Sequence, residues 1–227
     1  MNKLEILLIA TILIYPQVDL INEKYKSKNK IVEYIKIAIF LWVPTILLIF
    51  LYLNGLLSIG DFKFVVEYNW QNILMLSLLF IAIIYVFLLI NSIRINKELR
   101  EEIIKKFENY QDLMPVTRNE TIVFSIIVSV SAGICEELLF RAYLYNLIEG
   151  HIGLLAAVLL SSVIFGLWHI YLGWKEVIRT GIMGIVLCGI YIFTGNIILP
   201  ILIHIFVDVY SGLLNYNSLC NSHDESN

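Results

Sequence analysis

Residues 136–141 read Glu-Glu-Leu-Leu-Phe-Arg and stand inside an apolar stretch that runs from residue 121 to residue 148. A helix needs about 20 apolar residues to cross a bilayer core, so this stretch is long enough to span it. A charged side chain in hydrocarbon costs somewhere between about 3 and more than 10 kcal/mol unless it is paired or reached by water. The stretch therefore predicts a transmembrane helix whose three charges, on Glu136, Glu137 and Arg141, serve a function.

Two later apolar stretches contain polar side chains in a similar pattern. Phe165 precedes His169 by four residues, and His204 precedes Asp208 by four residues. Residues four apart lie on one face of a helix, so each pair is predicted to share a face. With the first motif, this places six ionisable side chains in three apolar segments.

The whole chain has the composition of a membrane protein. Hydrophobic residues make up 59% of its 227 residues and charged residues only 15%, which is more apolar surface than a soluble domain of this length can bury. The net charge of -3 and the lack of a basic run interleaved with aromatic residues speak against a nucleic-acid partner. We expect a multi-pass protein of the cell membrane, surrounded by lipids.

The predicted fold class is all-α, a polytopic membrane helical bundle with about seven transmembrane segments. The predicted segments are residues 4–21, 37–57, 73–93, 121–148, 152–174, 177–193 and 197–214. The first is the weakest, because it contains Glu5, Pro16 and Asp19. We expect it to be a retained helix and not a signal peptide, since only Lys3 precedes it and no Ala-x-Ala-like cleavage site follows.

The connection over residues 94–120 is long for a membrane bundle. Its apolar residues Leu99, Ile103, Ile104 and Phe107 recur at helical spacing among charges, which predicts an amphipathic helix at the cytoplasmic interface. The lysine and arginine residues gather in connections that fall on one side of the bilayer, so the N-terminus is predicted outside and the C-terminus inside. The expected parts of this one integrated domain are residues 1–120 with the first membrane helices and the connection, residues 121–214 with the catalytic core, and residues 215–227 as a polar tail.

The first motif predicts two different tasks for its two carboxylates. Glu137 and Arg141 are four residues apart, so they can pair across one helical turn and neutralise each other. Glu136 points about 100° away from Glu137 and need not share the arginine. A buried carboxylate without a partner can take a proton from water and later return it, so Glu136 is the predicted general base.

The histidines supply the rest of a site for a catalytic water. An aspartate near a histidine can orient its ring, either for proton transfer or as a metal ligand, and Asp208 is placed to do this for His204. Two histidines with one or two carboxylates suit a site with or without zinc. His169 and His204 are the candidate zinc ligands, and the metal is left open because no His-Glu-x-x-His motif is present.

The order Glu-Glu-x-x-x-Arg, Phe-x-x-x-His, His-x-x-x-Asp on successive apolar segments resembles the CAAX protease and bacteriocin-processing family (CPBP, also called Abi) of intramembrane proteases. The resemblance covers residues 123–214, and the third motif ends in Asp208 where the eukaryotic members usually have asparagine. It implies a membrane hydrolase that cleaves a peptide bond of a membrane-associated peptide or protein, in peptide maturation or in self-immunity against a bacteriocin. It leaves open whether the enzyme is a metalloprotease.

The resemblance also implies roles for individual residues. Glu136 and His169 would activate the water, and His204 with Asp208 would stabilise the oxyanion or orient its donors, a task worth about 3–4 kcal/mol per donor. The supporting residues would be Glu137, Arg141 and Phe165.

Two other functions remain open at this point. The same polar residues could form a proton or cation relay in a membrane transporter. The chain could also be a non-catalytic immunity or binding protein of the same fold.

One distance opposes the predicted site. In straight helices that rise 1.5 Å per residue, Glu136 lies about 22 Å from residue 121, whereas His169 lies only about 8 Å from Trp174 at the same side of the membrane. We expect a break at residues 131–133, a steep tilt, or a span that begins later than residue 121.

Overall fold

The computed structural model describes residues 2–22, 27–57 and 62–223. Within these ranges all regular secondary structure is helical, and there is no strand. The helices are α1 (Lys3–Asn22), α2 (Lys30–Leu53), α3 (Trp70–Ile95), α4 (Lys97–Phe107), η2 (Glu108–Tyr110), α5 (Arg118–Val123), η3 (Phe124–Ser129), α6 (Val130–Glu137), η4 (Leu138–Tyr145), α7 (Asn146–Ile152), α8 (Leu154–Leu167), η5 (Ile170–Leu172), α9 (Trp174–Thr194) and α10 (Ile198–His223).

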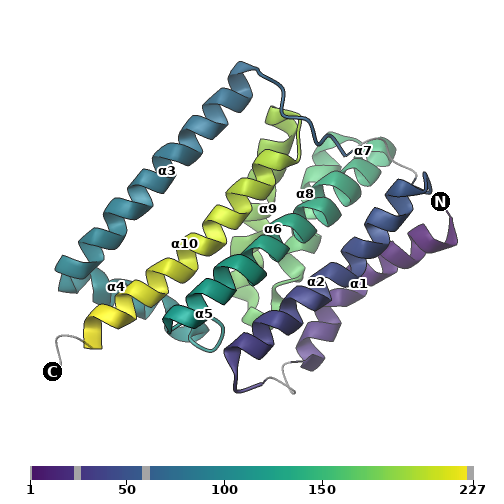
Figure 1. Cartoon of the computed structure of the whole chain (residues 1–227). Coiled ribbons are helices and arrows are strands. Elements are labelled where there is room, and N and C mark those ends of the chain that lie inside the picture. The colour runs from purple at the N-terminus through teal and green to yellow at the C-terminus, as the bar shows by residue number, and fades with distance from the viewer. Residues whose placement is uncertain (1, 23–26, 58–61, 224–227) are drawn as a thin grey trace.

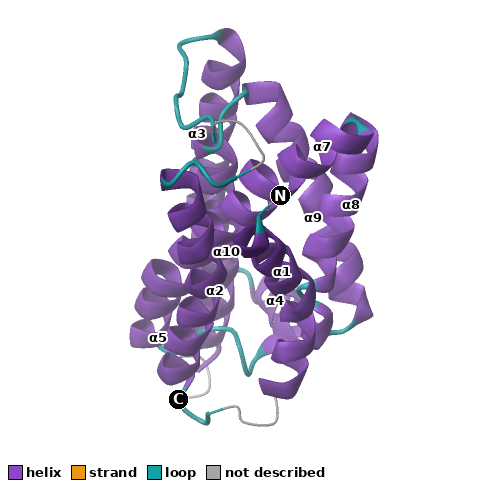
Figure 2. Ribbon diagram, turned by 90° about the vertical axis from the view of Figure 1, so that its right-hand side faces the viewer, coloured by secondary structure: helices purple, strands orange, loops and turns teal. Residues whose placement is uncertain are grey.

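A single continuous helix of 35 residues, Arg118–Ile152, forms the centre of the bundle. It comprises α5, α6 and α7 with two wider π-helical segments, η3 and η4, on either side of α6. Its start is fixed by a capping box in which Thr117 and Glu120 bond each other's backbone N–H groups. In Figure 1 the helix runs between α2 on one side and α10 on the other, and α3 stands at the edge beside α10. Figure 2 shows that the long helices share one direction and that the loops lie at the two ends.

Five helices of the described chain are long and apolar enough to cross a membrane. They are Lys30–Leu53, Trp70–Ile95, Arg118–Ile152, Trp174–Thr194 and Ile198–Cys220. The protein is therefore a multi-pass membrane protein, but the predicted count of about seven spans is not confirmed. The predicted span over residues 4–21 lies in part outside the residues whose side chains are described.

The predicted span over residues 152–174 is wrong in its extent. Its helix, α8, ends at Leu167 after 14 residues, which is about 21 Å of helix against a hydrocarbon core of about 30 Å. The chain then leaves helical geometry at His169 and passes through the short turn η5 to Gly173, whose φ of 97° favours glycine. His169 therefore stands on a connection and not on a helix.

The length of the central helix removes the depth conflict between Glu136 and His169. Glu136 precedes the turn at Gly153 by 17 residues, and His169 follows it by 16. Counted from that shared turn, both residues lie about 24–26 Å along the bundle. The central helix is about 52 Å long and exceeds the hydrocarbon core, so it begins earlier than the membrane needs.

The small residues at 131–133 do not break the helix, contrary to one of the expectations. They lie inside α6, and Gly133 lets α6 approach α10 closely. A Cβ atom at Gly133 would collide with Cγ1 of Ile205 and would stand 3.2 Å from the carbonyl oxygen of Ile201. Glycine at this position thus sets the distance between the first and third motifs.

Glycine also brings α8 and α9 together. A Cβ atom at Gly166 would lie 2.6 Å from the carbonyl oxygen of Val177, and one at Gly184 would lie 3.0 Å from Cβ of Ser162. The first distance is shorter than real Cβ contacts and the second is tighter than most of them, so glycine at these positions lets the two helices pack this closely. The two helices form a tightly packed hairpin that carries His169 at its end.

The predicted amphipathic helix is present as α4. Its buried residues Ile103 and Phe107 pack with Ile93 of α3 and Leu214 of α10. The apolar face of α4 therefore covers the ends of α3 and α10.

The helix α10 continues past Leu214, where the sequence predicts the polar tail to begin. Asn215 is fully buried, donates from Nδ2 to the carbonyl oxygen of Pro115 at 3.0 Å, and accepts from Gln111 Nε2 at 2.9 Å. These bonds fix the helix end to the connection before α5, which explains why a polar segment stays ordered. Of the predicted tail, residues 224–227 lie outside the described residues.

Candidate active site

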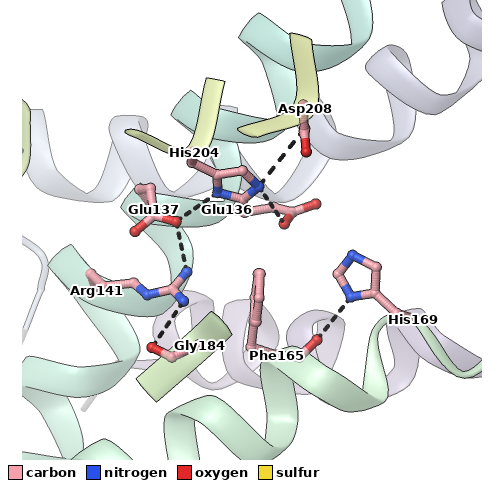
Figure 3. A network of polar contacts seen from close by, with 8 residues as sticks. All are labelled: Glu136, Glu137, Arg141, Phe165, His169, Gly184, His204 and Asp208. Atoms are coloured by element: carbon pink, nitrogen blue, oxygen red, sulfur yellow. Dashed lines mark hydrogen bonds and ion pairs between the residues drawn. The ribbon is translucent and has the colours of Figure 1, made fainter. Parts of the chain in front are cut away.

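A cavity of about 520 Å³ lies beside the middle of the central helix. Glu136 from α6, His204 and Asp208 from α10, and His169 from the connection after α8 all line it. Figure 3 shows Glu136 and His204 close together, with Asp208 above them and His169 facing them from the other side. Three separate elements thus bring all four predicted catalytic residues to one cavity.

Glu136 is almost fully buried, but its side chain lines the cavity. Its Oε2 atom makes no hydrogen bond within the described part of the protein and lies 3.7 Å from Nε2 of His204. Arg141 pairs instead with Glu137, as the helical spacing predicts. A buried carboxylate oxygen that lines a cavity and has no donor is suited to accept a proton from water.

His204 is oriented by Glu137, which the sequence does not predict. Its Nδ1 atom lies 2.7 Å from Oε1 of Glu137, whereas its Nε2 atom is 3.9 Å from Oδ2 of Asp208. Since an ionised carboxylate can only accept, Nδ1 carries the hydrogen and donates it. The remaining nitrogen, Nε2, then points toward Glu136 and Asp208 (Figure 3). Glu137 performs the orienting task that was expected of Asp208.

Glu137 also holds the predicted ion pair with Arg141. Nη1 of Arg141 donates to Oε1 of Glu137 at 2.8 Å, and both side chains are shielded from solvent. The guanidinium also donates from Nη2 to the carbonyl oxygen of Gly184 at 3.3 Å and lies 4.3 Å above the ring of Phe165. Such a cation over an aromatic face is attracted by the electron density of the ring. The carboxylate therefore connects α10 to the central helix, and the guanidinium connects the central helix to α9.

Phe165 packs between the two histidine rings. Its ring centroid lies 5.3 Å from that of His169 and 6.1 Å from that of His204, both edge to face. The carbonyl oxygen of Phe165 is 3.1 Å from Nδ1 of His169, so this nitrogen donates and Nε2 is left for the cavity. The supporting position expected for Phe165 thus has a geometric basis.

The rest of the cavity wall is largely apolar. The helix α2 contributes Ile37, Phe40 and Leu41, and the central helix contributes Phe124 and Val128. Two charged residues from the first turns of α2, Glu33 and Lys36, also line the cavity. No motif in the sequence singles out these wall residues, because they are ordinary helix residues until the bundle is assembled.

The described side chains do not make a complete zinc site. Catalytic zinc usually takes three protein ligands, and the described residues contain no group of three or more His, Cys, Asp or Glu side chains arranged to hold a metal. Nδ1 of His204 is bonded to Glu137, which leaves Nε2 as the ring atom that could face a metal. The described residues therefore lack a complete zinc ligand set, and zinc at His169 and His204 stays a prediction.

Residues 118–210 match the family model described as Type II CAAX prenyl endopeptidase Rce1-like. The matched segment begins with α5 and ends within α10, so it contains all three motifs. The resemblance read from those motifs is thereby confirmed. Neither a curated protein nor a solved structure matches the chain.

Proposed function

Because residues 118–210 carry the pattern of the CAAX protease family, we propose that this membrane protein is an endopeptidase in which Glu136 activates a water molecule. The observation that supports it best is the position of Glu136, His169, His204 and Asp208 around one cavity. A hydrolase needs a base, donors for the developing oxyanion and space for the substrate at one place, and this cavity offers all three.

In the proposed reaction, Glu136 and Nε2 of His169 hold the water, and Glu136 takes its proton as the oxygen attacks the carbonyl carbon of the peptide bond. A C–O bond forms and the carbonyl oxygen becomes an oxyanion. His204, whose Nδ1–H is bonded to Glu137, donates from Nε2 to that oxyanion when its ring carries the second proton. The C–N bond then breaks, and Glu136 returns the proton to the leaving amine.

The walls of the cavity support a peptide with apolar side chains as substrate. Ile37, Phe40 and Leu41 line the same cavity as the catalytic residues, and they favour apolar groups over charged ones. The proposed biological roles are peptide maturation and self-immunity against a bacteriocin.

The proposed topology has seven spans in the cell membrane. It adds α1 and α8 to the five helices that are long enough by themselves, and it places the N-terminus outside and the C-terminus inside. The support comes from the basic residues of the connection before α5, which lie at the same end of the bundle as the C-terminal end of α10 (Figure 1).

The test is cleavage of candidate peptides by purified protein, read by mass spectrometry. Peptides encoded by neighbouring genes should be cut by the wild type and not by Glu136→Gln. Glu149→Gln is the matched control, because it removes an exposed carboxylate from the end of the same helix and should cut like the wild type. Equal cleavage by Glu136→Gln would remove Glu136 from the mechanism. A transporter or a non-catalytic binding protein would release no product from any peptide.

A further inference from the structure

Trp168, the residue before His169, is fixed between two aromatic rings. It is 2% exposed and lines the catalytic cavity. Its ring stacks on Tyr15 of α1 with centroids 4.0 Å apart and an angle of 12° between the planes. The same indole also packs edge to face against the ring of Phe140, with the ring centroids 4.8 Å apart. The indole thus joins α1 to the wall of the site.

The indole N–H bonds a backbone carbonyl that the helix α1 cannot satisfy by itself. Nε1 of Trp168 donates to the carbonyl oxygen of Ile12 at 2.8 Å. In an α-helix this oxygen would accept from the amide of the residue four positions later, which here is Pro16. Proline has no amide hydrogen, so the carbonyl is left without its usual donor. Pro16, which weakens the first helix as a membrane span, thereby creates an acceptor for Trp168.

His169 is held mainly by the turn to which it belongs. Its amide donates to the carbonyl oxygen of Gly166 at 3.0 Å, and its ring packs edge to face on Phe165. Among the described residues its ring makes one hydrogen bond, from Nδ1 to the carbonyl oxygen of Phe165. Its backbone lies beyond the last turn of α8, with φ of -101° and ψ of 15°. The position of the ring in front of Glu136 therefore depends on what fixes the connection after α8.

We propose that Trp168 is a positioning residue for His169 and that α1 is part of the active site through it. Docking of the indole on the Ile12 carbonyl holds the connection after α8 so that His169 faces Glu136. This rests on the proposed function for its effect on catalysis, and α1 lies outside the residues that match the family. Ordinary packing would explain the stacking on Tyr15. It would not explain an indole N–H aimed at the one carbonyl in that turn whose donor proline removes.

The first variant is Trp168→Phe, which keeps an aromatic ring and removes the N–H donor. We expect kcat for peptide cleavage to fall about tenfold with KM changed less than about twofold, because the substrate-binding walls remain and one orienting hydrogen bond is lost. The matched control is Trp42→Phe. Its indole also joins two helices, donating to Oγ of Ser131 at 3.1 Å, but it is not a lining residue of the cavity. The control should keep wild-type kcat and KM.

The second variant is Pro16→Ala, which leaves Trp168 intact and supplies the missing amide hydrogen. The new donor competes for the Ile12 carbonyl, so the indole bond should weaken while α1 becomes a better helix. We expect kcat to fall about threefold with an unchanged or higher unfolding temperature. Loss of activity without loss of stability separates positioning from a general folding defect, and it decides the matter if Trp168→Phe does not fold.

The readout that does not need activity is the imidazole NMR signal of His169 in detergent micelles. The chain has four histidines, and the signal is assigned by its loss in His169→Gln. Trp168→Phe and Pro16→Ala should shift or broaden it, and Trp42→Phe should not. An unchanged His169 signal in both test variants would overturn the proposal. If the wild type cleaves no peptide but the signal shifts as expected, the positioning stands and the proposed function fails.

Discussion

Oε1 of Glu137 accepts two hydrogen bonds, from Nδ1 of His204 at 2.7 Å and from Nη1 of Arg141 at 2.8 Å. One buried carboxylate oxygen therefore fixes a ring on α10 and neutralises a cation on its own helix. The two tasks can be separated by mutation.

Removing one member of the Glu137–Arg141 pair should destabilise the protein strongly. Glu137→Ala or Arg141→Ala leaves the other charge buried without its partner, which costs about 3–5 kcal/mol. The double variant Glu137→Leu with Arg141→Met removes both charges and should recover most of the free energy of unfolding, measured by denaturant titration in detergent. It should not recover peptide cleavage, since Nδ1 of His204 has lost its acceptor. A double variant that is both stable and fully active would show that His204 does not need Glu137.

Replacing Glu136 with glutamine should separate activity from stability. Cleavage should fall by about 10²–10⁴-fold, the usual contribution of a general base. The free energy of unfolding should rise by about 1–2 kcal/mol, because a buried carboxylate oxygen without a hydrogen bond is replaced by a neutral group. Thermal unfolding and a cleavage assay on the same sample measure both. A Glu136→Gln protein that is less stable than the wild type would mean that the carboxylate has a structural partner.

The contact between Gly133 and Ile205 should control the separation of the first and third motifs. Gly133→Ala adds a methyl group where Ile205 already stands, so we expect a loss of about 1–3 kcal/mol in unfolding free energy together with slower cleavage. Adding Ile205→Ala makes room for the new methyl group and should restore part of both. If the second change restores neither, the cause lies elsewhere than in the spacing of α6 and α10.

Asp208 should matter through its shape and polarity more than through a direct bond to His204. Its Oδ2 atom is 3.9 Å from Nε2 of His204, which is too far for a hydrogen bond. Asp208→Asn keeps the size and the polar atoms and should lower kcat by about tenfold, whereas Asp208→Ala should lower it by about a hundredfold. Steady-state kinetics on one peptide compares the two. Equal losses would mean that the negative charge itself is required.

Local spacing predicted the parts of the site that lie within one helix. The pairing of Glu137 with Arg141 and the separate direction of Glu136 follow from 3.6 residues per turn, and the structure confirms both. The helical character of the chain followed from its apolar stretches in the same way.

Contacts between helices could not be predicted, because nothing local fixes how two helices lie against each other. The bond from His204 to Glu137 joins residues 67 positions apart and depends on the close approach at Gly133. The early end of α8 could not be predicted because apolar residues stand on both sides of His169, and length alone extends the span to residue 174. The ordered segment after Leu214 could not be predicted because the partners of Asn215 lie about 100 positions earlier in the chain.

The close glycine contacts between α8 and α9 make the position of His169 depend on the packing of the whole hairpin. Because α8 and α9 are close-packed at Gly166 and Gly184, a shift of one helix against the other would lose these contacts, and the hairpin moves as one rigid unit. Arg141 connects this hairpin to the central helix by its hydrogen bond to the carbonyl oxygen of Gly184. A side chain at Gly166 or Gly184 would push α8 and α9 apart, and this displacement would reach the end of the hairpin, where the His169 imidazole lies.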